Sequence, residues 1–282
     1  MKAILFLNGP QGELALRSFP DPESLAVVVP AGADNSLIER MCRERAIACM
    51  ERLKDQPVAL TAGSYDYLVS SSFPYRILAA ECNAARLAAV NLHGAILPKY
   101  KGKNAGVWAL INDEKRVGMT MHRISEKFDA GEILHIDIHE INDGMSLQEI
   151  QGLLDRSVPK LVNFLLSGEV FKLPRPVIGS ESIFWRARTI HDSRINWHVP
   201  ARKTFLFIRA LSREPIYAYS HYNGVQYRIK RAMLSSQTSG SLPGAVVNMD
   251  DRLYVVCGDG RCLEITDYDG QGVSMAPGMV LH

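Results

Sequence analysis

The chain has 282 residues, a formal net charge of +2 and a hydrophobic fraction of 47%, which is enough for one large domain and one smaller one around buried cores. No apolar run approaches the ~18–20 residues of a membrane-spanning helix, and the opening residues 1–7 are too short for a secretory leader, so we expect a cytoplasmic protein without a membrane partner. The five scattered cysteines argue against a disulfide framework and suit a reducing compartment.

The first part of the sequence alternates short apolar strands with helical stretches. Residues 2–7 predict a buried strand followed by a Gly/Pro-containing turn at 8–12, and further strands are predicted at 25–29, 46–50 and 67–71, with a helix at 36–45. This alternation indicates a parallel sheet with helices on its faces, in which ligands lie beyond the carboxyl ends of the strands. Neither a G-x-G-x-x-G nor a P-loop motif occurs, so we predict no NAD, FAD or ATP site.

The middle of the chain continues this pattern. A helix is predicted at 104–112 and strands at 118–122 and 133–138. Ser146 and Glu149 have the spacing of a capping box, which predicts the start of an amphipathic helix. Pro159 lies inside that helix and should bend or divide it.

After about residue 174 the pattern changes to β structure. A short helix is predicted at 201–211, then strands at 216–222, 226–233, 253–257 and 262–266, with hairpin turns at Asn223-Gly224 and Gly258-Asp259-Gly260. We therefore predict an α/β protein: a Rossmann-like, mostly parallel sheet domain at residues 1–178, followed by a small OB-like antiparallel β-barrel domain at residues 179–282.

One stretch carries the residues of a candidate catalytic site. Asn91 and His93 follow an apolar run, so they are predicted at the end of a strand with both side chains on one face. Asp129 comes later in the sequence, in a loop from which its carboxylate can reach the imidazole. Individually, an asparagine at a strand end is usually a turn residue, and a single histidine is more often structural than catalytic.

The order and spacing of these residues resemble the signature of the 10-formyltetrahydrofolate-dependent formyltransferases. The signature comprises Asn91-x-His93, then Leu97-Pro98-x-Tyr100-Lys101-Gly102, then Asp129-x-Gly131, and the resemblance extends over most of the chain. The chain is most similar to the sugar N-formyltransferases, such as the enzyme that acts on UDP-4-amino-4-deoxy-L-arabinose. One departure is Lys101, where the family usually has arginine.

The resemblance implies the site residues and the substrates. In this family the asparagine, histidine and aspartate of the signature are catalytic, which implies Asn91, His93 and Asp129. The family shapes its folate pocket with the loop at residues 71–78, which implies donor contacts from Ser72, Phe73, Tyr75 and Ile77. The implied co-substrate is 10-formyltetrahydrofolate, and no metal is implied.

Formyl transfer is an acyl transfer, so it needs a donor for the developing oxyanion and a group that takes the proton of the attacking amine. We expect Asn91 to donate to the oxyanion, together with His93 as an imidazolium that Asp129 orients. The sequence leaves open whether Asp129 or a water takes the amine proton.

The expected acceptor is an amino group on a nucleotide-linked sugar used for a surface polysaccharide or glycolipid. Methionyl-tRNA, an amine on a peptide natural product, hydrolysis of the donor, and an inactive sugar-nucleotide-binding module remain as alternatives. Basic residues between 186 and 231 suit an anionic acceptor. The oligomeric state is open, with a homodimer as one option.

Overall fold

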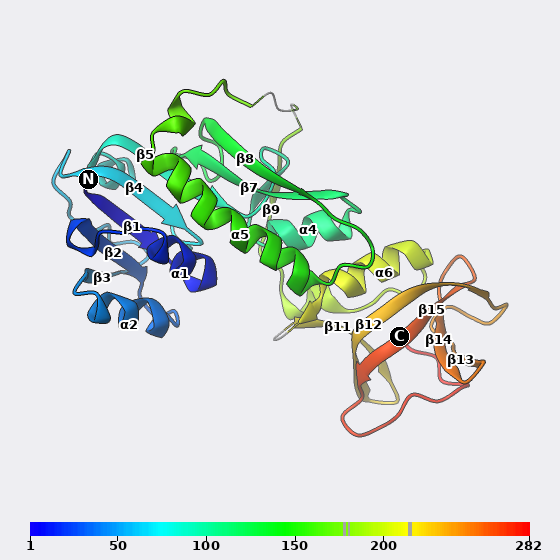
Figure 1. Ribbon diagram of the computed structural model, residues 1–282. Helices are drawn as coiled ribbons and strands as arrows, with labels where there is room; N and C mark the ends of the chain where they lie inside the picture. The colour runs from blue at the N-terminus through cyan, green and yellow to red at the C-terminus, as the bar shows by residue number, and fades with distance from the viewer. Residues whose placement is uncertain (177–178, 180, 214–215) are drawn as a thin grey trace. The chain divides into compact units, whose positions relative to one another are not determined.

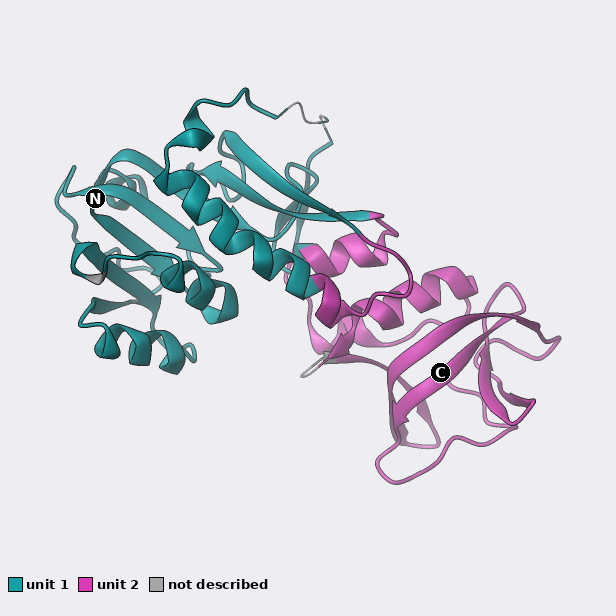
Figure 2. Cartoon of the chain, in the orientation of Figure 1, with its two compact units in different colours: residues 1–105, 116–140, 151–185 teal, residues 106–115, 141–150, 186–282 magenta. Residues whose placement is uncertain are grey.

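The computed structural model describes residues 1–176, 179, 181–213 and 216–282, and its contacts divide the chain into two compact units (Figure 2). The first unit comprises Met1–Ala105, Arg116–Glu140 and Gln151–Trp185, and the second comprises Gly106–Lys115, Ile141–Ile150 and Arg186–His282. Two short segments that precede residue 151 therefore belong to the second unit. The predicted domain boundary after residue 178 stays a prediction, and residue 178 lies outside the described part.

The first unit is built on a seven-stranded sheet with the order β3-β2-β1-β4-β5-β7-β8 (Figure 1). The five strands from β3 to β5 run parallel, whereas β7 and β8 are added antiparallel to β5 and to each other. The strand bounds are β1 Ala3–Leu7, β2 Leu25–Pro30, β3 Ala48–Arg52, β4 Tyr65–Ser71, β5 Ala85–His93, β7 Arg116–Arg123 and β8 Ile133–Glu140. This arrangement confirms the predicted mostly parallel sheet.

Helices α1 (Gly9–Arg17), α2 (Ser36–Glu44), α3 (Ala79–Cys82) and α4 (Ala105–Ile111) lie between these strands in the chain, and α5 (Leu147–Leu166) follows β8. The prediction of a turn at residues 8–12 was wrong, because α1 begins directly after β1. Pro10 occupies the first turn of this helix, where its fixed φ suits a helix and its missing N–H costs no hydrogen bond.

Helix α5 begins as the capping box predicts. The Glu149 carboxylate accepts hydrogen bonds from the backbone N–H and the hydroxyl of Ser146, and the Ser146 hydroxyl accepts one from the Glu149 N–H. The helix continues through Pro159 without interruption, so the proline does not divide it. Helices α1 and α5 meet on one face of the sheet, where Gln11 and Asp155 are 3.5 Å apart.

The other face of the sheet carries a hydrophobic cluster. It contains Ile4 and Phe6 of β1, Leu68 of β4, and two residues of the loop after β4, Phe73 and Ile77. Because side chains alternate along a strand, this is also the face toward which Asn91 and His93 of β5 point, while Leu92 between them is buried on the α1 face. The candidate catalytic residues therefore extend from the rim of a packed core.

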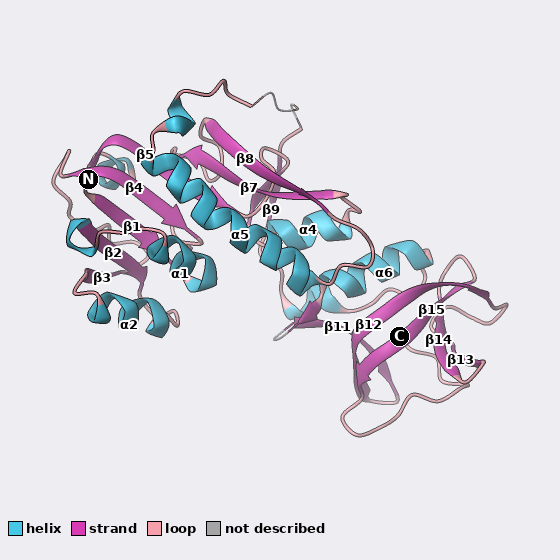
Figure 3. Cartoon of the chain, viewed as in Figure 1, coloured by secondary structure: helices cyan, strands magenta, loops and turns pink. Residues whose placement is uncertain are grey.

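The second unit contains one antiparallel sheet with the order β10-β11-β12-β15-β14-β13 (Figure 3). The bounds are β10 Ser212–Arg213, β11 Ile216–Tyr222, β12 Val225–Thr238, β13 Val246–Met249, β14 Arg252–Val256 and β15 Arg261–Asp269. Asn223 and Gly224 both have positive φ, at 47° and 80°, as the predicted hairpin turn requires. Helix α6 (Ala201–Ala210) packs its apolar side against this sheet. The predicted antiparallel C-terminal region is confirmed.

None of the helices in the described part of the chain combines the length and the apolar character that crossing a membrane requires.

Candidate active site

Asn91 and His93 lie at the carboxyl end of β5, opposite His122 and Thr120 of the antiparallel strand β7. Asp129 lies in the loop between β7 and β8, and the hairpin formed by these two strands returns it to the end of β5. The Asp129 carboxylate is 3.5 Å from the Asn91 amide nitrogen and 3.6 Å from Nδ1 of His93. The structure thus brings together the three residues that the sequence pattern singles out.

The backbone around Asp129 explains the Asp-x-Gly pattern. Asp129 itself has a left-handed φ of 50°, a conformation that aspartate tolerates better than most residues. A side chain on Gly131 would overlap the carbonyl group of Arg123, because the loop returns to the end of β7 at this point. Glycine is therefore required there to bring the Asp129 loop over the sheet.

A short strand, β6 (Tyr100–Gly102), holds the imidazole and the carboxylate through its backbone. Nε2 of His93 is 2.6 Å from the carbonyl oxygen of Tyr100, and because a carbonyl can only accept, Nε2 carries a proton. The backbone N–H of Gly102 donates to Oδ2 of Asp129 at 2.9 Å. Nδ1 of His93 is consequently the nitrogen that faces Asp129.

Strand β6 is itself fixed by pairing in parallel with β9 (Ile183–Trp185). The ring of Trp185 stacks on that of Tyr100, with centroids 6.1 Å apart, and the N–H of Lys103 donates to the Trp185 carbonyl oxygen at 3.1 Å. A segment some eighty residues later in the chain therefore supports the backbone groups that hold His93 and Asp129.

A second histidine, His122, joins the site. Its Nδ1 is 2.8 Å from the carbonyl oxygen of Arg123, so Nδ1 carries a proton. In the neutral ring Nε2 then accepts a hydrogen bond, and the nearest donor is the Asn91 amide at 3.1 Å, whereas Asp129 is 3.5 Å away. This contact fixes which end of the Asn91 carboxamide is the NH₂ group. His122 lies outside the sequence pattern of the candidate site, because only the register of β5 on β7 places it opposite Asn91.

The surroundings set the charge states of His93 and Asp129. Burial lowers the pKa of His93 below its ordinary 6.5, and the neighbouring Asp129 carboxylate opposes this only in part. For Asp129, burial alone would raise the pKa, but the contact with His122, the positive charge that His93 carries when protonated, and the Gly102 N–H outweigh it and leave the pKa lowered. The site therefore favours an ionised Asp129 beside a neutral His93 near pH 7.

The loop expected to contact the donor lies beside this site, with its residues in different environments. Phe73 and Ile77 belong to the buried cluster, and Phe73 contacts Phe6 edge to face at 5.3 Å. Tyr75 lines a pocket, and its hydroxyl donates to the Ala31 carbonyl oxygen at 3.2 Å. The hydroxyl of Ser72 donates to Gln11 at 3.2 Å. Their roles as donor contacts stay predictions.

A buried ion pair anchors this loop. Arg52 and Glu81 are joined by two hydrogen bonds of 2.7 and 3.1 Å, and their side chains are 1% and 0% exposed. Arg52 also donates to the Arg76 carbonyl oxygen, and Glu81 accepts from the backbone N–H of Leu78 and Val58. The pair thus ties the segment after β3 to the loop after β4. Sequence reasoning missed it, because the two residues are far apart in the chain and belong to no motif.

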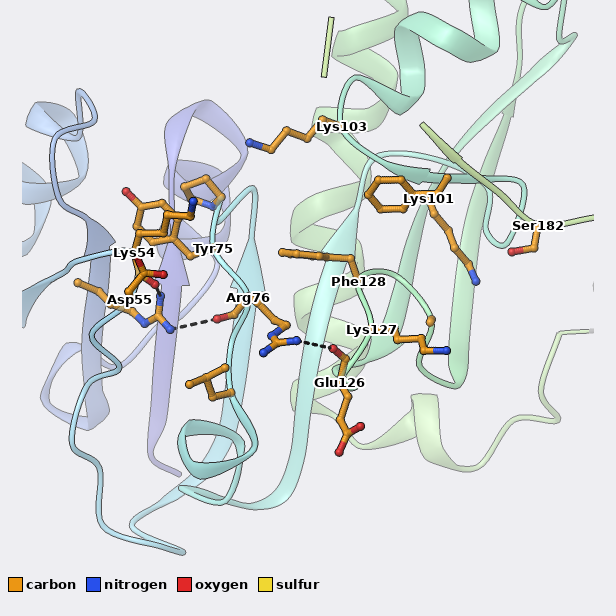
Figure 4. Close-up of a pocket in the computed structure, with 15 residues that line it drawn as sticks. Lys54, Asp55, Tyr75, Arg76, Lys101, Lys103, Glu126, Lys127, Phe128 and Ser182 are labelled. Atoms are coloured by element: carbon orange, nitrogen blue, oxygen red, sulfur yellow. Dashed lines mark hydrogen bonds between the residues drawn. The ribbon is translucent and has the colours of Figure 1, made fainter. Parts of the chain in front are cut away.

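A pocket of about 890 Å³ opens next to Asp129 (Figure 4). Its wall includes both chain neighbours of Asp129, Phe128 and Ala130, together with Tyr75 and Leu78 of the loop after β4. The pocket provides room for a substrate beside the candidate catalytic groups. Among the residues that the structure describes, no group of histidine, cysteine and acidic side chains has the arrangement of a metal site.

Comparisons with known proteins agree with this arrangement. Residues 35–159 match the family model described as formyl transferase, and residues 189–277 match the model of the formyl transferase C-terminal domain. Together the two models span about three quarters of the chain.

Solved structures of similar fold include several formyltransferases. An N-formyltransferase from Helicobacter canadensis, in complex with folinic acid and dTDP-3-aminofucose, is 17% identical with a TM-score of 0.74, over 94% of this chain and 98% of that one. WlaRD, a sugar 3N-formyltransferase in the presence of dTDP and 5-N-formyl-THF, is 14% identical with a TM-score of 0.71, over 97% and 99%. A 4-N formyltransferase from Francisella tularensis is 18% identical with a TM-score of 0.61, over 79% and 93%.

The first family model matches the part of the chain that forms the mostly parallel sheet, and the second matches the antiparallel C-terminal part. The first match contains the Asn91, His93 and Asp129 cluster. The chain therefore belongs to the formyl transferase family, whose members carry out folate-dependent formyl transfer.

Proposed function

We propose that this formyltransferase transfers the formyl group of 10-formyltetrahydrofolate to the amino group of a nucleotide-linked amino sugar. The observation that carries the proposal is the meeting of Asn91, His93 and Asp129 at the rim of the sheet, beside a pocket of about 890 Å³. Sugar N-formyltransferases that match this fold over nearly their whole length support the choice of acceptor.

Asn91 is the proposed donor to the oxyanion that develops when the amine attacks the formyl carbon. One N–H of its amide is directed to Nε2 of His122, which leaves the other N–H for the substrate oxygen. The longer contact to Asp129, at 3.5 Å, is weak enough to be exchanged for the oxyanion. A donor fixed before the reaction stabilises the transition state without the cost of reorganisation.

His93 is the proposed proton carrier. Its Nε2 proton is committed to the Tyr100 carbonyl, so the neutral ring offers the Nδ1 lone pair on the Asp129 side. This assignment differs from the imidazolium donor expected from the sequence, because burial lowers the pKa of His93 and favours the neutral ring in the free site.

The proton balance follows from these positions. The amine nitrogen forms a bond to the formyl carbon, and its proton passes to Nδ1 of His93 while Asp129 stabilises the resulting imidazolium. When the bond between the formyl carbon and N10 of the folate breaks, the same proton passes to N10. The ring returns to its neutral form, and no covalent intermediate with the protein is needed.

A panel of acceptors tests the proposal. Purified protein is incubated with 10-formyltetrahydrofolate and one of several dTDP- or UDP-linked amino sugars, or with methionyl-tRNA; the product is identified by mass spectrometry and tetrahydrofolate release is followed by absorbance. We expect formylation of at least one sugar nucleotide and loss of turnover in His93→Ala. Formylation of methionyl-tRNA alone would assign the protein to a different acceptor class.

A further inference from the structure

Two cysteines of the first unit meet at a distance from the candidate active site. Cys42 lies in α2 and Cys49 in β3, the strand at one edge of the seven-stranded sheet, and α2 contacts β3 (Figure 1). Three strands separate β3 from β5, which carries Asn91 and His93. Cys42 is buried and Cys49 is exposed, so solvent reaches one member of the pair directly.

The end of α2 turns the chain so that Cys49 returns to Cys42. The N–H of Ile47 donates to the Cys42 carbonyl oxygen at 2.8 Å, the N–H of Ala46 donates to the Arg43 carbonyl oxygen at 3.2 Å, and Ala46 has a left-handed φ of 54°. These features form the Schellman motif, in which residues at the end of the helix contact the first residues after it. Ile47 is buried, and Cys49 follows it by two residues, on the same side of the extended chain.

The position of β3 in the sheet determines the direction of the Cys49 side chain. Its chain neighbour Met50 packs against the hydrophobic cluster that contains Ile4 and Phe6. Because side chains alternate along a strand, Cys49 points to the opposite face of the sheet, where α1 lies and α2 contacts α1. On that face the Cys49 sulfur accepts a hydrogen bond from the Cys42 thiol.

This contact makes the two thiols chemically unequal. The hydrogen bond from Cys42 lowers the pKa of Cys49 and raises that of Cys42, and burial raises the pKa of Cys42 further. Burial also raises the pKa of Cys82, to about 11. Because the thiolate is the reactive form of cysteine, an oxidant from solvent reacts first with Cys49. Once Cys49 is oxidised it is no longer an anion, so its part in raising the pKa of Cys42 ends.

We propose that Cys42 and Cys49 form a reversible oxidation site, at which hydrogen peroxide converts the two thiols into an intramolecular disulfide. The Cys49 sulfur attacks one peroxide oxygen and the O–O bond breaks, which gives a sulfenic acid and, with the Cys49 proton, one water. The Cys42 sulfur then attacks the Cys49 sulfur and the S–O bond breaks, so that the hydroxide and the Cys42 proton leave as a second water. Two electrons and two protons pass from the thiols to the peroxide, and a dithiol such as dithiothreitol returns them.

Two other cysteines that are close in the chain do not have this geometry. Cys257 and Cys262 flank the hairpin turn between β14 and β15, where Cys262 is opposite Val256. Cys257, the next residue after Val256, therefore points to the other face of the sheet, and it packs in a different hydrophobic cluster from Cys262. Both are buried, so they serve as an internal comparison in which no disulfide is expected.

Peptide mapping of the oxidised full chain tests the inference. The reduced protein is treated with hydrogen peroxide, the remaining thiols are alkylated with iodoacetamide, and the protein is digested with trypsin without a reductant. Cleavage after each arginine places the two cysteines on separate peptides, residues 41–43 and 46–52. We expect these peptides to be recovered joined, with the mass of the intact protein lowered by about 2 Da for the two lost hydrogens. Dithiothreitol should separate the peptides, and Cys257 and Cys262 should be recovered as alkylated thiols.

Three variants assign the roles of the two thiols. Cys49→Ser changes an exposed side chain and should abolish the loss of about 2 Da. Cys42→Ala should leave the sulfenic acid of Cys49 without a partner, so that further peroxide oxidises it to the sulfinic acid, with a mass gain of about 32 Da. Cys82→Ser is the matched control and should form the joined peptides as the wild type does. Thermal unfolding verifies that each variant is folded before oxidation.

Two results would overturn the inference. In one, wild-type peptide 46–52 carries a sulfinic acid while Cys42 is recovered alkylated, which means that the buried thiol does not reach its neighbour. In the other, Cys49 joins two copies of the chain, seen as a covalent dimer on a non-reducing gel. The measurement needs neither a folate nor an acceptor, so its result is independent of the proposed function.

Discussion

Gly102 is the residue whose substitution tests most directly how the site is held. It has a φ of +91°, and a Cβ there would lie more than 1 Å inside the ordinary contact distance of 3.4 Å from the Trp185 carbonyl oxygen. In Gly102→Ala, β6 must therefore move away from β9 by about 1 Å. The same movement displaces the Tyr100 carbonyl from His93 and the Gly102 N–H from Asp129.

A displacement of about 1 Å in groups that position the reacting atoms typically lowers the rate by roughly 10²-fold. We therefore expect kcat of Gly102→Ala to fall about a hundredfold, measured as tetrahydrofolate release with the acceptor found in the panel. The decrease should appear in kcat rather than only in KM, because the displaced groups act on the transition state.

A matched variant separates this effect from general destabilisation. Gly244 in the second unit also has a positive φ, at +87°, and a Cβ there would overlap the Leu281 carbonyl oxygen to a similar degree. Gly244→Ala should lower Tm without a comparable loss of kcat. The reasoning is refuted if Gly102→Ala keeps kcat within about threefold of wild type, or if both variants lose activity only in proportion to their Tm.

Three further predictions concern the charges and donors of the site. Asp129→Asn should shift the NMR titration midpoint of His93 further below 6.5, because the anion that raises its pKa is removed; a rise would contradict the assigned electrostatics. Asn91→Ala should lower kcat by about 10²–10³ with little change in Tm, as expected for one oxyanion donor, and near-normal turnover would exclude that role. Arg52→Met should lower the free energy of unfolding by about 3–5 kcal/mol in urea titrations, because it leaves Glu81 buried without its cation, whereas Arg52→Met/Glu81→Leu should recover much of the loss.

Much of the fold follows from local sequence patterns. The strands of the parallel sheet appear as short apolar runs because both of their faces are covered, and β2 is buried along its whole length. The Ser146 capping box and the Asn223-Gly224 turn were also predictable, because the residues that form each of them are close together in the chain. Helix α1 was missed because its glycines and proline are typical of a turn.

The candidate site was only partly predictable. Asn91 and His93 are two residues apart on one strand, so their shared face follows from strand geometry. His122 reaches them through the register of β5 on β7, and the Arg52–Glu81 pair through packing between two loops. Such long-range pairings depend on tertiary structure, and no local pattern encodes them.

The His93 imidazole and the Asp129 carboxylate are held by main-chain atoms of β6 rather than by its side chains. An amide N–H or carbonyl is the same whichever residue supplies it, so position 101 is free to change without disturbing the neighbouring anchors. The lysine at this position therefore leaves both anchors intact. The side chain at the middle of this short strand can therefore differ between enzymes that use different acceptors or donors. Gly102, which ends the strand, is constrained to remain glycine.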